Sequence, residues 1–512
     1  MTASTPAPVA NRGWITVSIM LATFMQGVDT TIANVALPHM QGSLSAAQDQ
    51  IAWVVTSYIV AAAIMTPLTG WLAGRFGIKY VFLISVAGFT VASALCGMAM
   101  SLTQLVLYRL LQGVCGAALV PLSQAVLLQI NPPHRHGQAM AVWGMGVILG
   151  PIVGPALGGW LTDNYSWRWV FYINLPVGVL AAAGIMIFIH ETRRAQREAF
   201  DFFGFVTLSL AIGALQMLLD RGELKDWFGS TEIWVETTIA GLCLYLFIVH
   251  TITAGNRSFL NREMLTDPNL VAGTVMMFLI GIPLYGTMTL LPTMLQDLMN
   301  YPVFTTGLVI APRGVGTMIA MILVARLAGR VDTRLLILVG ILVTAVAMWQ
   351  MTGFSLQMGM GPVISTGVMQ GFGLGFVFTP LSIVTFSTLP RHTMTQGTAI
   401  FSLMRNIGGS VGISIVEALL DQNTQIVHSR LVEQLRPDNP LARVPQLGLL
   451  NSLTTPSGVA ALNAEATRQA AMVAYIDDYM LMMMLVIAAL PLLLLLRRPR
   501  SMPGGAAVAA LD

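Results

Sequence analysis

The apolar positions of the chain fall into long continuous runs, separated by short polar segments that contain most of the charged residues. A helix that crosses the hydrocarbon core of a bilayer needs roughly 20 mostly apolar residues. Fourteen runs of that kind are present, and they begin near Gly13, Ile51, Tyr80, Gln104, Ala139, Trp169, Phe205, Ile233, Asn269, Gly307, Leu335, Val363, Gln396 and Ile476. The pattern therefore predicts an all-α integral membrane protein with fourteen transmembrane helices.

The distribution of positive charge predicts the orientation of these helices. An even number of spans places both termini on one side of the membrane. The loops on that side carry sixteen of the 26 lysines and arginines, whereas the loops on the other side carry seven. Because cytoplasmic loops are enriched in Lys and Arg, both termini are predicted to lie in the cytoplasm.

The composition excludes several classes of protein. Charged residues make up 10% of the 512 residues and apolar residues 55%, whereas a soluble domain usually carries about 25% charged residues. A soluble enzyme, a nucleic-acid-binding protein and a disordered chain are therefore excluded. The three cysteines lie in separate apolar runs, and neither lysine, Lys79 or Lys225, follows a glycine as a phosphate-binding Gly-Lys-Ser/Thr loop requires. No metal site, cofactor or P-loop ATPase is predicted.

Short motifs recur at a nearly constant separation, which indicates an internal repeat. The sequence Leu-Ala-Gly-Arg at 72–75 recurs at 327–330, Gln-Gly at 112–113 recurs at 370–371, and the glycines at 150 and 154 recur at 408 and 412. These matches align the second predicted helix with the tenth, the fourth with the twelfth and the fifth with the thirteenth. Two parallel six-helix halves around a central path are typical of one large class of alternating-access transporters.

The repeat divides the chain into four predicted segments. Residues 1–190 form a first six-helix bundle, residues 191–268 a two-helix insert with its flanking loops, residues 269–496 a second six-helix bundle, and residues 497–512 a cytoplasmic tail. The second bundle contains a polar outer segment, 421–475, with four prolines. A docking surface for an outer partner and a flexible linker explain this segment equally well.

Several motifs together resemble those of the major facilitator superfamily. Segment 70–79 (Gly-Trp-Leu-Ala-Gly-Arg-Phe-Gly-Ile-Lys) is similar to its signature between helices 2 and 3, segment 109–113 (Arg-Leu-Leu-Gln-Gly) to its membrane-embedded arginine motif, and segment 150–159 to the antiporter signature of drug exporters. Segment 21–38, which includes Asp29 and Asn34, resembles the fourteen-helix drug:H+ antiporter family. Segments 167–178 and 219–228 are similar to the EmrB-type multidrug exporters.

This resemblance implies proton-coupled efflux of amphipathic or hydrophobic drugs across the bacterial inner membrane by alternating access. The implied partners are membrane lipid, small-molecule drugs and protons, together with a periplasmic adaptor protein and an outer-membrane channel. A dedicated exporter of a single metabolite is the alternative on the same fold, and a membrane enzyme or receptor is a more distant one. The family usually has an acid where this chain has Gly74, so latching of the cytoplasmic gate is expected to depend on Arg75 or on other contacts.

Ionisable residues inside the predicted helices are the candidates for proton coupling, because a charge in the bilayer core is costly. Asp29 in the first helix and Arg109 in the fourth lie at similar depths in the outer half of the membrane, so they are able to pair. An aspartate that moves between wet and buried surroundings binds and releases a proton; a static ion pair that locks the two helices is the structural alternative. Glu417, near the outer end of the thirteenth helix, is a second candidate, with a solvated residue at the mouth of the path as its alternative.

Other polar residues in the spans are candidates for the substrate path or for charge balance. Arg313 and Arg405 are predicted to neutralise an acid or to bind an anionic substrate, and hydrogen bonds to the carbonyls of a kinked helix would also explain Arg313. The remaining candidates are Asn406, which follows Arg405, and Gln26 and Asn34 in the first helix.

Glycines at four-residue spacing are candidates for a gate. In the fifth helix Gly150, Gly154 and Gly158 form a stripe without side chains, which lets another helix approach closely, and Pro155 permits a bend. The same motif contains Gly159, and the matching stripe in the thirteenth helix contains Gly408 and Gly412. A close, bendable contact between the halves suits a gate; helix packing without a gating role is the alternative.

Overall fold

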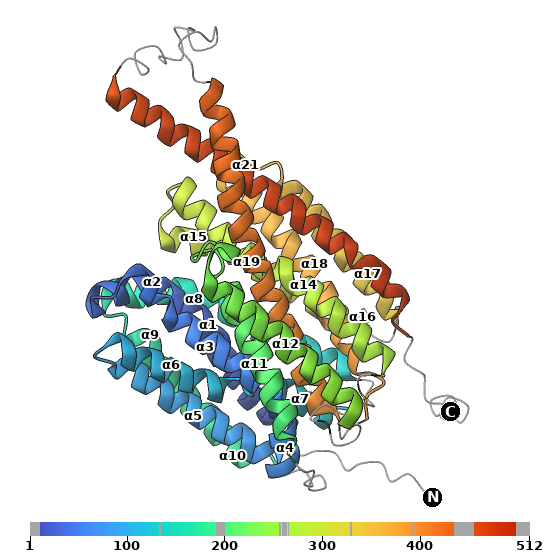
Figure 1. Cartoon of the computed structure of the whole chain (residues 1–512). Helices are drawn as coiled ribbons and strands as arrows, with labels where there is room; N and C mark the ends of the chain where they lie inside the picture. The colour runs from blue at the N-terminus through green and yellow to red at the C-terminus, as the bar shows by residue number, and fades with distance from the viewer. Residues whose placement is uncertain are drawn as a thin grey trace, which may run out of the picture.

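The computed structural model is a bundle of helices, with no β-strand in the residues that it describes (Figure 1). Those residues are 11–132, 135–190, 200–254, 258, 264, 266–327, 330–390, 393–434 and 455–497. The helices are α1 (Arg12–Leu44), α2 (Gln48–Ile51), α3 (Trp53–Met65), α4 (Leu68–Phe76), α5 (Ile78–Met98), α6 (Leu102–Gly116), α7 (Leu119–Ile130), α8 (His136–Asn164), α9 (Trp169–Tyr172), α10 (Asn174–Phe188), α11 (Phe202–Arg221), α12 (Thr231–Ala254), α14 (Pro268–Thr293) with the short η4 (Met294–Leu298), α15 (Val303–Ile310), α16 (Pro312–Leu327), α17 (Thr333–Met351), α18 (Met360–Phe386), α19 (Met394–Gln434) and α21 (Pro456–Ala488) with η7 (Leu490–Leu494). The predicted all-α class is confirmed.

The number of membrane-spanning helices agrees with the sequence pattern. Thirteen continuous or nearly continuous helices are long and apolar enough to cross a membrane. The second predicted helix is divided into α3 and α4, whose axes differ by 57°. The break lies at Thr66 and Pro67, and a proline removes one N–H group from the helical hydrogen-bond ladder. With this bent pair counted as one span, the described residues contain fourteen candidate spans.

Capping side chains mark the first residues of two of the spans, α11 and α14. Asp201 accepts a hydrogen bond from the Gly204 N–H at 2.8 Å at the start of α11, and Asp267 accepts one from the Leu270 N–H at 2.8 Å at the start of α14. Such caps satisfy N–H groups that have no partner within the helix. The first thirteen predicted spans begin within a few residues of their observed starts.

The outer segment is the main departure from the predicted boundaries. α19 continues to Gln434, and α21 begins at Pro456, which is well before the expected start of the last span at Ile476. Much of segment 421–475 is therefore helical rather than linker, and residues 435–454 lie outside the described residues. The two extensions protrude from the end of the bundle opposite the first turn of α1 and the end of η7 (Figure 1). We call them the distal hairpin, and the two ends of the bundle the distal and terminal ends.

The helix contacts repeat between the two parts of the chain. α1 packs along α8 as α14 packs along α19, and α5 packs against α6 as α17 packs against α18. The helices α11 and α12 pack mainly against each other, and α11 also contacts α3 and α19. This arrangement matches the order of a first half, an insert and a second half, whereas the predicted boundaries at residues 190 and 269 stay a prediction.

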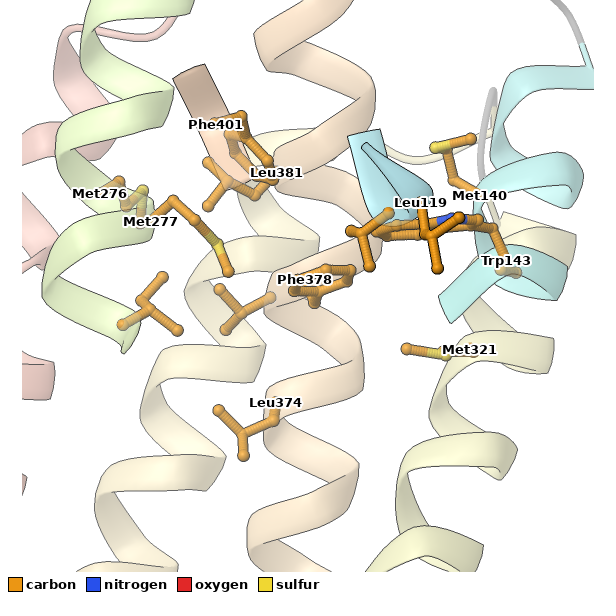
Figure 2. Packing of buried hydrophobic residues seen from close by; sticks show 14 of the residues in the cluster. Leu119, Met140, Trp143, Met276, Met277, Met321, Leu374, Phe378, Leu381 and Phe401 are labelled. Carbon is orange, nitrogen blue, oxygen red and sulfur yellow. The ribbon is translucent and has the colours of Figure 1, made fainter. Parts of the chain in front are cut away.

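A hydrophobic core joins the two halves towards the terminal end. Trp143 of α8 and Phe378 of α18 stack with their ring centres 5.7 Å apart, beside Met321 of α16 (Figure 2). A buried hydrogen bond from the Thr398 hydroxyl of α19 to the Pro121 carbonyl of α7, 3.1 Å long, also crosses between the halves. The halves are therefore in direct contact on this side of the centre.

Candidate functional site

Asp29 lies on α1 within a fully buried polar network. Its side chain is 0% exposed and accepts hydrogen bonds from three donors on two other helices. Arg109 Nη1 of α6 donates to Oδ2 at 2.7 Å, while Gln112 Nε2 of α6 and Asn174 Nδ2 of α10 each donate to Oδ1 at 2.8 Å. Three helices therefore meet at one carboxylate, and both of its oxygens have partners.

Arg109 is fixed by further contacts. Its Nε donates to the Val54 carbonyl of α3 at 3.0 Å, and its guanidinium carbon lies 4.4 Å from the centre of the Tyr58 ring. Its Nη1 also donates to Gln112 Oε1 at 2.9 Å. A planar guanidinium with several fixed donors suits such a buried site better than a flexible ammonium. Asp29 and Arg109, which their similar depths allow to pair, do form an ion pair, whereas the choice between a coupling role and a static lock stays a prediction.

Two members of the network, Gln112 and Asn174, are not predicted as site residues from the sequence, although both lie in the family motifs. Asn174 also donates to the Ser93 hydroxyl at 3.0 Å, and Ser93 donates to the Phe171 carbonyl at 2.9 Å. Buried polar side chains nearly always have hydrogen-bond partners. An amide side chain inside an apolar span therefore indicates a buried polar site, as a charged side chain does. Both amides are visible in the sequence as polar residues within apolar runs.

The second half carries an uncharged counterpart of this network. Gln370 of α18 donates from Nε2 to the Thr287 hydroxyl of α14 at 3.1 Å, and both side chains are buried. Gln370 and Thr287 each lie 258 positions after their counterparts Gln112 and Asp29. At the same separation, Gly367 stands where Arg109 would be expected. Among the described residues, a buried Asp–Arg pair is thus present in the first half and replaced by neutral groups in the second.

Glu417 lies in the distal half of α19 and is half-buried. It makes no hydrogen bond or ion pair within the described part of the chain, and the charged groups that act on it are Glu223 and Asp220 of the insert. Glu223 belongs to the loop after α11, outside the spans, where partial burial and then the charge of Asp421 raise its pKa. The insert and α19 thus form an acidic region at the distal end, and both candidate roles of Glu417 stay predictions.

Arg313 and Arg405 are buried in the second half and form no ion pair with a described acid. Arg313 Nη2 on α16 donates to the Leu284 carbonyl of α14 at 3.5 Å, so the alternative of a bond to a helix carbonyl is present. Arg405 on α19 contacts its neighbour Asn406, with Nε and Nη2 each 3.4 Å from Oδ1. A direct role of these residues towards a substrate stays a prediction.

The remaining substrate-path candidates lie on α1 on either side of Asp29. Gln26 is half-buried, one helical turn before Asp29, and Asn34 is exposed in the distal part of the helix. Neither side chain donates to the Asp29 carboxylate. In the described residues, no group of three or more His, Cys, Asp or Glu side chains could hold a metal ion.

The glycine stripes lie against the first helix of their own half. A Cβ atom at Gly150 of α8 would be 2.5 Å from the carbonyl carbon of Gly27 on α1, and Gly154 and Gly158 also face α1. Pro155 lies inside α8 and half-buried Gly159 follows Gly158. The stripe therefore allows close packing of α1 on α8.

The stripe of α19 repeats this arrangement on α14. A Cβ atom at Gly408 would be 2.2 Å from the Phe278 carbonyl oxygen, and one at Gly412 would be 2.5 Å from the Ile282 carbonyl oxygen. The close contacts are thus made within each half rather than between the halves. A gating role of the two stripes stays a prediction.

Gly150→Ala is expected to destabilise the protein, because the added methyl group would meet the backbone of Gly27 rather than a movable side chain. Overpacking of this kind costs about 1–3 kcal/mol. The matched control is Gly241→Ala on α12, where a Cβ atom would meet nothing within 4 Å. Thermal unfolding of the purified protein in detergent checks this prediction, and equal unfolding midpoints for the two variants would contradict it.

The loop 2–3 signature lies at the terminal end, where α4 contacts α19. Arg75 is exposed and forms no ion pair with a described acid. The close approach is made instead by Gly70, where a Cβ atom would lie 2.5 Å from Gln396 Cγ of the second half. Contacts other than Arg75 therefore join the halves here, and latching by Arg75 stays a prediction.

With this geometry in place, comparison with known proteins identifies the family. A model of the Major Facilitator Superfamily matches residues 19–413. The chain belongs to the Major Facilitator Superfamily. It is 35% identical over 449 residues to the multidrug export protein EmrB of Haemophilus influenzae. The aligned residues cover 86% of this chain and 88% of that protein. It is 37% identical over 433 residues to the fatty acid resistance protein FarB of Neisseria gonorrhoeae, with coverage of 84% and 85%.

Solved structures support the superfamily fold. The human organic anion transporter MFSD10 (TETRAN) superposes with a TM-score of 0.61, covering 93% of this chain and 99% of that chain at 15% sequence identity. At that identity the likeness concerns the fold alone. The major facilitator fold expected from the sequence is therefore confirmed, and the chain is a multi-pass transporter of this superfamily.

Proposed function

We propose that this protein exports amphipathic and hydrophobic drugs across the bacterial inner membrane by alternating access, driven by protons that move inward. Similarity over 84–86% of its length to proteins named for multidrug export and fatty acid resistance supports this substrate class. In this proposal, residues 1–190 and 269–496 are the two moving bundles, and the termini face the cytoplasm, which the excess of positive charge on their side supports. The substrate is moved without chemical conversion.

The observation that carries the coupling is the buried Asp29 carboxylate, held by donors from α6 and α10. A proton on this carboxylate removes its charge and weakens its charge-assisted hydrogen bond to Arg109. The contact between α1 and α6 is then free to change. Proton binding at one atom is thereby linked to movement between helices, as a coupled transporter requires.

The test is transport by the purified protein in proteoliposomes with an imposed pH gradient. A lipophilic fluorescent cation such as ethidium serves as the substrate, and a pH-sensitive dye reports proton flux. Substrate movement against its gradient, with proton flux that depends on substrate, is expected. Absence of that substrate-dependent flux in well-incorporated protein would remove the antiporter proposal and leave the receptor or membrane-enzyme alternatives.

A dedicated exporter of a single metabolite is the second candidate function on this fold. It differs from a multidrug exporter in the breadth of compounds transported. Protection of expressing cells against several unrelated amphipathic compounds supports the first proposal. Protection against one compound only supports the second.

We further propose that the distal hairpin is the docking surface for a periplasmic adaptor protein, which would in turn connect to an outer-membrane channel. The hairpin extends both α19 and α21 well beyond the apolar part of the bundle, and its arms touch where His428 Nε2 lies 3.0 Å from Asn463 Oδ1. A helical projection offers a more defined surface than a linker, because its backbone is already ordered and binding loses less entropy.

Shortening both arms of the distal hairpin is expected to abolish association with the adaptor while leaving transport in proteoliposomes unchanged. The variant joins residues 427 and 464 by a short Gly/Ser linker. Affinity purification from the native host after mild crosslinking, followed by mass spectrometry, measures the association. The His428→Ala variant, which keeps both arms, is the control. Unchanged recovery of a periplasmic partner with the shortened variant would contradict the proposal.

A further inference from the structure

Asp478 of α21 is a buried acid that sequence reasoning does not single out. Its side chain is 1% exposed, and neither carboxylate oxygen has a hydrogen-bond partner among the described residues. The preceding residue, Asp477, is exposed. In the sequence the two acids look alike, because both lie at the start of the last apolar run. Only the packing of the helix separates them.

The residue that follows Asp478, Tyr479, is buried among apolar and aromatic groups. α21 packs against α14, α17 and α19. The adjacent Tyr479 is 0% exposed, its hydroxyl lies 3.7 Å from the sulfur of Met294, and its ring meets Phe354 at 5.9 Å between centres. Its hydroxyl therefore already has a partner, and it does not donate to Asp478.

The charged groups around Asp478 do not balance a negative charge. On α21 itself, the ionisable side chains within one turn are Asp477 and the tyrosines at 475 and 479, whereas Glu465 and Arg468 lie more than two turns away. The charges of Glu417 of α19 and Asp297 of η4 act on Tyr475. The other charged or titratable residues of α19 are Arg405, Asp421, His428, Arg430 and Glu433, and none of them forms a hydrogen bond or ion pair with Asp478. The one titratable side chain in α14 is a tyrosine at 285, and the one cation in α17 is an arginine at 334, at the terminal end of that helix. Arg313 of α16 interacts with Tyr479, but it forms no ion pair with Asp478.

The contrast with Asp29 is direct. Asp29 has three donors and an arginine, so its negative charge is compensated where it lies. Asp478 is equally buried and has neither donor nor cation. The negative charge of a carboxylate in that position has nothing to compensate it. The neutral acid is therefore favoured there, because transferring an ion out of water costs far more free energy than transferring the neutral acid. The packing around Asp478 is therefore compatible with the neutral carboxylic acid.

We propose that Asp478 is a second proton-binding site of the transporter, which holds a proton in the present arrangement. When the path is open towards the distal end, the Asp478 carboxylate takes a proton from a hydronium ion, an O–H bond forms and a water molecule is released. When the path is open towards the terminal end, that O–H bond breaks and the proton passes to water on that side, so one proton crosses the membrane. The proposal rests on the proposed proton-coupled export, and it places one proton carrier in each half.

The first experiment does not depend on transport. Infrared difference spectra of the purified protein, recorded between neutral and alkaline pH, contain the C=O stretching band of any carboxylic acid that loses its proton. Such a band is expected in the wild type and in Asp477→Asn, and it is expected to be lost in Asp478→Asn. A spectrum of Asp478→Asn identical to that of the wild type would overturn the proposal, whether or not the protein transports drugs.

The second experiment measures coupling. In proteoliposomes with an imposed gradient of one pH unit, accumulation of ethidium by Asp478→Asn is expected to fall about tenfold, because one proton per cycle is lost from the coupling, with Asp477→Asn unchanged. The amide is nearly isosteric with the neutral acid, so an unfolding midpoint equal to that of the wild type is expected and separates loss of coupling from loss of folding. Full accumulation by Asp478→Asn would overturn the coupling role. An inactive wild type would instead contradict the proposed function, and the infrared result would still decide the proton site.

Discussion

Asp29→Asn is expected to abolish proton-driven accumulation of substrate while substrate still binds. The asparagine cannot bind and release a proton in the physiological range, so the step that links the proton gradient to α1 is lost. Each proton that moves down a gradient of one pH unit supplies about 1.4 kcal/mol, which corresponds to about a tenfold concentration ratio of the exchanged substrate. The variant is expected to lose that ratio and to permit only equilibration across the membrane.

The measurement compares three proteins in proteoliposomes with the same pH gradient: the wild type, Asp29→Asn and the control Asp163→Asn. Asp163 lies near the distal end of α8 and is exposed, so its loss removes an acid without touching the network. Substrate binding is measured separately in detergent by fluorescence titration. If Asp29→Asn accumulates substrate as the wild type does, Asp29 is a structural ion-pair partner and the proton site lies elsewhere.

The second half shows that a buried hydrogen bond between the equivalent helices forms without a carboxylate. Gln370 and Thr287 reproduce one hydrogen bond of the network without a carboxylate or a buried arginine partner. A helix contact of this kind is therefore stable without any titratable group. Since the fold does not need the ion pair for its architecture, its presence in the first half favours a function that uses charge.

Much of the architecture follows from the sequence because the bilayer imposes a simple rule. Every backbone polar group inside it must be satisfied within the helix, so long apolar runs predict spans with little ambiguity. The repeat then relates the two halves, and the similar depths of Asp29 and Arg109 permit the ion pair that the structure contains. The structure of the outer segment could not be predicted in the same way. Its residues are mostly polar and have no apolar periodicity, so the sequence does not indicate that α19 extends to Gln434.

The details of the site required the packing. Asp477 and Asp478 are adjacent and chemically identical, and the rotation of α21 alone buries one and exposes the other. The glycine stripes also illustrate this limit. A four-residue spacing shows that some helix approaches closely, but it does not say which one. The structure places α1 against Gly150 and α14 against Gly408, within each half.

Arg109→Gln is expected to produce the largest loss of stability of any single substitution in the network. It leaves the Asp29 carboxylate 0% exposed, with only the amide donors of Gln112 and Asn174. Breaking a buried ion pair from one side typically costs about 3–5 kcal/mol, because the remaining charge is uncompensated. Denaturant unfolding of the purified protein in detergent micelles measures this loss.

The double variant Asp29→Asn/Arg109→Gln separates charge from packing. It removes both charges and keeps side chains that can hydrogen-bond, so it is expected to regain most of the stability that Arg109→Gln loses. Glu465→Gln is the surface control. It breaks the exposed pair with Arg468, 3.6 Å long, and is expected to cost no more than about 1 kcal/mol. If the double variant is as unstable as Arg109→Gln, the lost stability comes from the packing of the arginine on Tyr58 and Val54. It then does not come from an uncompensated charge on Asp29.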